Sequence, residues 1–434
     1  MNLHPIYFCY GIIFWTAVNA IDPSTITDTL SLANDLGGFI ESQDFSKTAS
    51  KLISSVSPYL GIIGSVLSFA FGFLNTGPSA ELVAIQKLYK EVTLRFDRID
   101  HQFAAISREI HWVNIEAHYG SYESTIHVVG EKYRALAAST SKTEYNARKQ
   151  FFLSSYKQYN EAGGKIYDGV MGQSNLFNGP IFDEAIRHLE WDRKKTQQFM
   201  LGVTKLLIDA AAIEIAYYEL TKPSLASFIQ HDWRVKFEHL KKTLLAADHK
   251  LMTQYGSQLA TDVDKFVSDH AHSSNCDITN PLESKLQHKY YWRNWLVVTS
   301  DHNTDPKKYQ VHVCPGIGGV INNNHGKNVV VASVDAHKAH LSTVQQHVVN
   351  YVHVSHTYHI MHGGKRNVEK RLTGHRRNDA NVAFSSFPSE ARTSCHTYGS
   401  IGVIDRGLNT CWRSPSAHLY TRDDGHYYKV YAFG

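Results

Sequence analysis

The stretch Leu52–Leu74 reads LISSVSPYLGIIGSVLSFAFGFL and lies inside a run of 29 residues, Leu52 to Ala80, that carries no charge. A helix of roughly 20 apolar residues crosses the hydrocarbon core of a bilayer, so this run is long enough to insert. A helix that is apolar on every face is also typical of the buried centre of a helical bundle. The sequence therefore predicts either a membrane-insertion segment or a central helix or hairpin, and Leu52–Leu74 decides which kind of protein this is.

Small residues recur through this stretch at steps of four, which allows two helix backbones to approach closely in lipid. The small-residue positions are Ser57, Gly61, Ser65, Gly64, Ser68 and Gly72. The apolar residues between them are the candidates for insertion into a membrane. They are Leu60, Ile62, Ile63, Val66, Leu67, Phe69, Phe71, Phe73 and Leu74.

A regular heptad stripe follows the uncharged run, with apolar residues at alternating steps of three and four. Its members are Leu82, Ile85, Tyr89, Val92, Phe96, Ile99, Phe103, Ile106, Ile110 and Val113. This pattern predicts one long helix with a narrow packing seam. At 1.5 Å per residue, about 35 residues give a helix of roughly 50 Å.

Helical spacing continues to about residue 270. The segments 122–136, 145–159, 181–220 and 225–267 read as helices, whereas the Gly- and Asn-rich segment 165–180 reads as a loop. The segment FMLGVTKLLIDAAAIEIAYYEL, Phe199–Leu220, is apolar on most faces and suits the central helix of a bundle.

After Cys276 the pattern changes to period two, with β-forming residues between Gly, Pro, Asn and Asp. The expected strands are 290–299, 309–313, 328–334, 347–360, 381–387 and 427–433. We therefore expect an α + β protein in two parts: a helical bundle over residues 21–275 that contains the apolar segment 52–74, then a mainly β putative binding domain over residues 276–434.

The N-terminus and the cysteines indicate secretion. Residues 1–20 contain an apolar stretch that ends in Val18-Asn19-Ala20, which is typical of a signal peptide and its cleavage site. Four cysteines remain after cleavage, all in the last part of the chain: Cys276, Cys314, Cys395 and Cys411. An even number in a secreted chain predicts two disulfides with three possible connectivities. Of these we expect the sequential pairing, Cys276 with Cys314 and Cys395 with Cys411.

Charge is unevenly distributed. The segment from Cys276 to the C-terminus holds 18 Lys and Arg against 11 Asp and Glu, a balance of +7. Three dibasic pairs, 365–366, 370–371 and 376–377, fall close to histidines at every third position from His353 to His362. A solvated loop, a headgroup contact and a processing site all fit the basic pairs. The histidines fit exposed surface, a surface that gains charge as pH falls, or a metal site, although a strand would scatter them over both faces.

No recognisable catalytic motif, phosphate-binding loop or zinc pattern occurs. We therefore expect no enzyme activity, no cofactor and no bound metal. A secreted chain is also a poor candidate for nucleic-acid binding.

The segments SPYLGIIGSVLSFAFGFL, Ser57–Leu74, and ELVAIQKLYKEVTLRFDRID, Glu81–Asp100, resemble the pore-forming toxin family of jellyfish stinging cells, the box-jellyfish nematocyst type. Within the second segment, Arg95-Phe96-Asp97 and Ile99 carry most of the likeness. The resemblance covers about residues 40–270. It implies a helical bundle similar to the pore-forming domain of δ-endotoxins and a haemolytic protein stored in nematocysts. It further implies self-association in the target-cell membrane.

The residues and the resemblance together predict a secreted, cytolytic pore-forming toxin that inserts a helical segment into membrane lipids. A glycan or an anionic headgroup is the expected partner of the β domain. Two other classes stay open: a non-lytic, lectin-like secreted binding protein, and a secreted hydrolase whose catalytic residues form no familiar motif.

Overall fold

The computed structural model describes residues 44–73, 116–174, 177, 179–314, 318–336, 355–362, 365–372, 380–385, 399–415, 417–423 and 428–434. The chain divides into two compact units, Met1–His249 and Lys250–Gly434. The predicted signal peptide and the heptad seam Leu82–Val113 lie outside the described residues.

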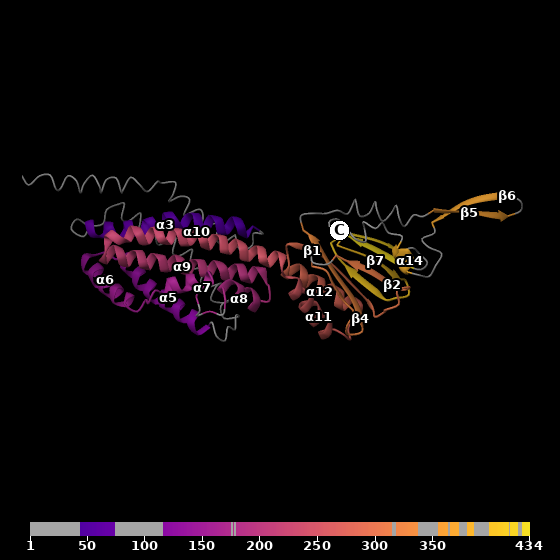
Figure 1. Ribbon diagram of the computed structural model, residues 1–434, viewed down its shortest axis with the longest axis horizontal. Helices are drawn as coiled ribbons and strands as arrows, with labels where there is room; N and C mark the ends of the chain where they lie inside the picture. Colours follow the sequence, from indigo (N-terminus) through magenta and orange to yellow (C-terminus); the bar gives the residue numbers. More distant parts are fainter. Residues whose placement is uncertain are drawn as a thin grey trace, which may run out of the picture. The chain divides into compact units, whose positions relative to one another are not determined.

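The described part of the first unit is entirely helical, as the sequence predicts (Figure 1). Its helices are α3 (Phe45–Phe73), α5 (Glu116–Ala137), α6 (Lys142–Tyr156), α7 (Ala162–Val170), α8 (Ile181–His188), α9 (Arg193–Thr221) and α10 (Pro223–Thr253).

Local sequence sets where two of these helices begin. The Ser141 hydroxyl accepts a hydrogen bond from the Glu144 N–H, and the Glu144 carboxylate accepts one from the Thr140 N–H. Two backbone N–H groups at the start of α6 thus have side-chain acceptors. The Asp192 carboxylate accepts from the Lys195 N–H at the start of α9.

Helix α9 is the central element of the first unit. It packs against α3, α5, α7 and α8. Its middle is buried on nearly every face, and this includes Lys205, whose ammonium group forms an ion pair of 2.7 Å with Asp209. The prediction that the apolar segment Phe199–Leu220 lies at the centre of a bundle is therefore confirmed.

The second unit contains a β-sandwich with helices on its outer faces. Helices α11 (Gly256–Asp269) and α12 (Asn275–Lys289) precede the strands, and α14 (Ala380–Ser385) falls between them. The strands are β1 (Arg293–Asp301), β2 (Tyr309–Val313), β3 (Val320–Asn322), β4 (Lys327–Asp335), β5 (Ser355–His362), β6 (Lys365–Leu372), β7 (Ser400–Asp405), β8 (Thr410–Arg413), β9 (Leu419–Asp423) and β10 (Tyr428–Phe433).

Two antiparallel four-stranded sheets form the sandwich, in the orders β3-β4-β1-β8 and β2-β7-β10-β9. Residues alternate between the two faces of each strand. On β10, Tyr431 and Phe433 lie in the core between the sheets, whereas Val430 and Ala432 pack with Ala380 of α14 on the outer face. Because a helix covers the outer face, β1 and β10 are buried on both sides and read as nearly continuous apolar runs.

The structure corrects four details of the sequence prediction. The segment 165–180 holds helix α7, whose residues Ile166 and Val170 are buried. The segment 381–387 holds α14 rather than a strand. The predicted helix 225–267 is two helices, because helical structure is interrupted at Tyr255. Tyr255 is buried and packs against Tyr290.

The fourth detail concerns the division of the chain. We expected the boundary at residue 275, and the structure places it after His249. The physical reason is that α12 packs on β1 and β8, and α11 packs on β3, so both helices belong to the core of the second unit.

Candidate functional site

Helix α3 carries the predicted insertion segment, and it is one continuous helix of 29 residues. Its first turn is capped by Asp44, whose carboxylate accepts a hydrogen bond of 3.0 Å from the Lys47 N–H. Helix geometry continues through Pro58, although proline supplies no backbone donor.

The side chains that the structure describes in α3 lie within residues 45–63, and those of one face are buried. The buried apolar residues follow a helical period and are Phe45, Ala49, Leu52, Ile53, Val56, Tyr59, Leu60 and Ile63. Lys47, Lys51 and Ser54 are exposed on the other side. This stripe packs against α9, the central helix.

Of the two long apolar helices, α9 is the one that packs against four other described helices, α3, α5, α7 and α8. The buried side chains described in α3, from Phe45 to Ile63, form a stripe that packs against α9. The side chains of α3 after Ile63 and all of residues 74–115 are outside the described part of the chain. The expectation that Leu52–Leu74 lies at the centre of the bundle therefore stays a prediction.

The predicted insertion residues fall into three groups. Leu60 and Ile63 are fully buried. Ile62, Val66, Leu67, Phe69, Phe71 and Phe73 have helical backbone, as do the small residues Ser57, Gly64, Ser65, Ser68 and Gly72. Leu74 lies outside the described residues. Among the described helices, none is both long enough and apolar enough to cross a bilayer.

Gly61 marks a close approach between α3 and α10. The carboxamide oxygen of Gln230 accepts hydrogen bonds of 3.1 Å from the Gly61 N–H and from Arg234. A methyl group at position 61 would lie 3.7 Å from the nearest atom, at the carboxamide end of the Gln230 side chain, so a small side chain fits here. The small residues of α3 thus include at least one that faces another helix of the first unit.

A buried carboxyl group joins α9 to α10. The Trp233 indole donates a hydrogen bond of 2.9 Å to Glu214. Burial raises the pKa of Glu214, although the hydrogen bonds from Trp233 and Tyr159 and the charge of Lys236 act in the opposite direction. Tyr159 also accepts a hydrogen bond from the Gly163 N–H, at 3.1 Å, so α7 connects to the same group.

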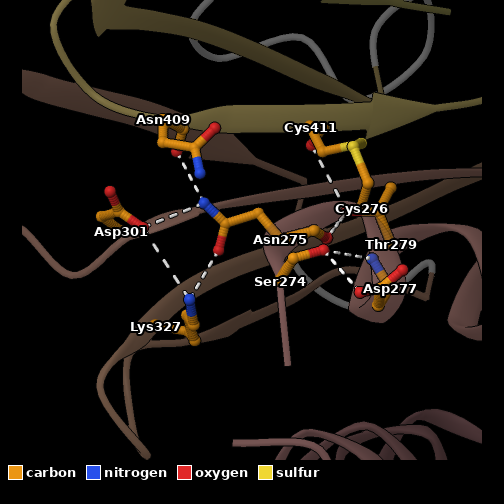
Figure 2. Close-up of a disulfide and its surroundings, with 9 residues drawn as sticks. All are labelled: Ser274, Asn275, Cys276, Asp277, Thr279, Asp301, Lys327, Asn409 and Cys411. Atoms are coloured by element: carbon orange, nitrogen blue, oxygen red, sulfur yellow. Dashed lines mark hydrogen bonds and ion pairs between the residues drawn. A yellow bond between two sulfur atoms is a disulfide. The ribbon is translucent and has the colours of Figure 1, made fainter. Parts of the chain in front are cut away.

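The second unit contains a disulfide between Cys276, in the first turn of α12, and Cys411 in β8 (Figure 2). The expected sequential pairing is therefore wrong. The two cysteines are 135 residues apart, and they meet because α12 covers β1 and the edge strand β8. Cys314 is also disulfide-bonded, to a cysteine outside the described residues.

A polar cluster surrounds this disulfide. The Asn275 amide nitrogen donates to the Asp301 carboxylate at 3.0 Å and to the Asn409 carbonyl at 2.8 Å, and the Lys327 ammonium donates to the Asn275 oxygen at 2.8 Å (Figure 2). Asn275 is only 2% exposed. One buried amide therefore links the start of α12 to three separate parts of the first sheet. Sequence reasoning missed this cluster, because nothing near Asn275 marks it as different from other helix starts.

Strands β5 and β6 form a separate two-stranded ribbon that pairs with neither four-stranded sheet (Figure 1). The register places His356 opposite Arg371, His359 opposite Val368 and His362 opposite Lys365. Alternate positions fall on opposite faces, so His359 is on one face while His356 and His362 are on the other. No group of metal-binding side chains converges within the part of the chain that the structure describes.

Comparison with known proteins finds a family match in the helical part of the chain. The model of the cephalotoxin-like middle helical domain matches residues 75–273. Protein rapunzel of the zebrafish Danio rerio is 20% identical over 210 residues, which are 48% of this chain and 90% of the zebrafish protein. No solved structure matches significantly.

The family match begins two residues after α3 ends and includes α5 to α11. It ends just before Cys276, so the disulfide and the sheets lie beyond it. The helical middle of this chain is thus similar to a domain of a toxin-like family.

Proposed function

We propose that this protein is a secreted, membrane-permeabilising toxin that inserts the apolar α3 segment into the membrane of a target cell. The observation that carries the proposal is the place of α3. Within the described residues, the buried side chains of α3 from Phe45 to Ile63 form one stripe that packs against α9, whereas α9 also packs against α5, α7 and α8. Such a helix can separate from the bundle while α9 keeps its contacts with α5, α7 and α8.

Release of α3 has a cost that a membrane can offset. Exposing each buried Val, Leu or Ile side chain to water costs about 1.5–3 kcal/mol. The buried stripe from Leu52 to Ile63 holds five such residues, so separation in water is unfavourable by roughly 10 kcal/mol. Lipid replaces the apolar surroundings, and a helix enters lipid with its backbone hydrogen bonds satisfied. The uncharged run continues to Ala80 and adds apolar length.

The similarity to the cephalotoxin-like middle helical domain supports a toxin-like role, and the resemblance of Ser57–Leu74 to jellyfish pore-forming toxins supports insertion. Secretion, lysis of cells, self-association through small residues and the box-jellyfish type are finer parts of the same proposal. Residues 1–20 and the disulfide fit a secreted protein.

A cross-link between α3 and α10 tests the proposal. Gly61→Cys with Gln230→Cys places two thiols where the helices meet, and a short bismaleimide joins them. We expect the unlinked double variant to release dye from lipid vesicles. The linked protein is expected to release little, because α3 cannot leave the bundle.

The matched controls are the two single-cysteine variants treated with the same reagent, which are expected to keep their leakage. Circular dichroism and size-exclusion chromatography confirm that the linked protein keeps the native fold. Leakage by the linked protein equal to that of the unlinked protein would rule out insertion of α3, as would the absence of leakage from every form.

A further inference from the structure

The ribbon β5–β6 is strongly basic and, among the described strands, pairs with neither four-stranded sheet. Its second strand contains Lys365, Arg366, Lys370 and Arg371 and one acidic residue, Glu369, while its first strand has no acidic residue. The ribbon therefore carries a formal charge of +3 before any histidine is protonated. The whole chain, at 434 residues, has a formal charge of only +4.

The register spreads this charge over both faces. Lys365 and Arg371 are opposite His362 and His356 on one face, and Arg366 and Lys370 are opposite Met361 and Thr357 on the other. No Lys or Arg of β6 is directly opposite another Lys or Arg, so cross-strand pairs of like charge form only when His356 or His362 is protonated. An anionic surface attracts charge of this sign on either face.

The pairing of the two strands separates this charge from the sandwich. Among the described strands, β5 and β6 pair with each other and join neither the sheet β3-β4-β1-β8 nor the sheet β2-β7-β10-β9. The basic residues of β6 are therefore not part of either sheet, and a group of basic residues attracts a surface of opposite charge.

We propose that the β5–β6 ribbon is a docking element for anionic lipid headgroups, which holds the protein at a membrane surface. The choice of lipid over another polyanion rests on the proposed function, in which the chain must reach a bilayer. Each basic residue near an anionic leaflet strengthens binding on the order of fivefold. Four of them account for a gain of at least about a hundredfold over a neutral membrane.

The test is co-sedimentation of the full chain with two kinds of vesicle: phosphatidylcholine alone, and a mixture of phosphatidylcholine and phosphatidylserine. We expect binding to the mixed vesicles, weakened by salt because exposed charges are screened. Neutralising the ribbon with Lys365→Gln, Arg366→Gln, Lys370→Gln and Arg371→Gln is expected to reduce this binding at least about a hundredfold.

The matched control removes the same number of charges from exposed positions of the first unit. It changes Lys132, Lys157, Lys222 and Lys242 to Gln. This control is expected to bind within a few-fold of the parent protein. Equal losses in the two variants would mean that net charge alone attracts the chain, which would overturn the docking role of the ribbon. Binding to heparin beads but not to the mixed vesicles would overturn it as well.

These outcomes are separate from those of the cross-link. If the ribbon variant loses binding while the linked protein still binds without leakage, both proposals stand. Ribbon-dependent binding by a protein that never permeabilises vesicles supports docking and refutes the proposed function. Undiminished binding by the ribbon variant refutes docking and leaves insertion of α3 in place.

Discussion

Gly163 of α7 lies directly against Ala210 of α9, so closely that a Cβ atom at position 163 would be 2.5 Å from the Cβ atom of Ala210. The Tyr159 hydroxyl would also be 2.5 Å away. The next residue, Gly164, belongs to the same helix and has no atom within 4 Å of an added Cβ. Two adjacent glycines in one helix thus have opposite surroundings.

This contrast makes a matched pair of substitutions. Gly163→Ala is expected to lower the free energy of unfolding by about 1–3 kcal/mol, because α7 must move away from α9. Gly164→Ala is expected to raise it by up to about 1 kcal/mol, because alanine favours the helical backbone. Urea unfolding followed by circular dichroism measures both, and changes of the same sign would contradict the packing.

The ion pair between Arg193 and Asp248 gives a second prediction. Arg193 donates two hydrogen bonds of 2.8 Å to the Asp248 carboxylate, and both residues are 4% exposed. Asp248→Ala is expected to lower the free energy of unfolding by about 3–5 kcal/mol, because it leaves a buried guanidinium without its carboxylate. Glu131→Ala, at an exposed position of α5, is the control and is expected to change little.

A double variant separates loss of charge pairing from loss of packing. Arg193→Met with Asp248→Leu removes both charges and keeps apolar volume, and it is expected to recover most of the stability lost in Asp248→Ala. If the double variant is as unstable as Asp248→Ala, the ion pair itself stabilises the bundle, and the loss in Asp248→Ala does not come from the unpaired guanidinium.

The third prediction concerns pH. Because burial raises the folded-state pKa of Glu214 above its unfolded value near 4.5, folding favours the protonated carboxyl. The contribution of Glu214 to stability is thus fully present below pH 4.5 and is lost as pH rises through the folded pKa. Glu214→Gln keeps an acceptor for Trp233 and cannot ionise.

The Glu214→Gln variant is therefore expected to be more stable than the parent at pH 7. The difference between the two proteins is expected to shrink as pH falls toward 4.5. Thermal unfolding at several pH values measures it, with Glu131→Gln as the exposed control. A variant less stable than the parent at pH 7 would show that the charged carboxylate is favoured in the fold.

The fourth prediction tests the disulfide. Digestion without reduction is expected to yield a peptide pair that joins Cys276 to Cys411, and a pair that joins Cys276 to Cys314 would contradict the structure. Replacing both cysteines, Cys276→Ser with Cys411→Ser, is expected to cost about 2–5 kcal/mol in the stability of the second unit. The helical first unit is expected to unfold as in the parent.

Periodicity determined much of the architecture from sequence alone. The apolar faces of Phe199–Leu220 predict the central helix α9, and strand β2 begins and ends at Tyr309 and Val313, as the period-two pattern predicts. The presence of a disulfide is likewise confirmed, whereas helix α12 falls where the sequence predicts the start of the β domain. The confirmed features depend on which residues of a segment must be buried away from water, and the order of residues within each segment determines that.

Only the tertiary structure decided the partners of those segments. The spacing of four cysteines does not reveal that Cys276 bonds to Cys411, because that depends on α12 covering the first sheet. The Gly-rich sequence of α7 is a poor helix former, and burial of Ile166 and Val170 against the bundle overrides that preference. That α9 packs against α3, α5, α7 and α8 follows from how the described helices assemble, which the apolar run of α9 does not specify. A pattern of apolar residues shows that a surface must be buried, but the neighbour that buries it is set by packing across the whole chain.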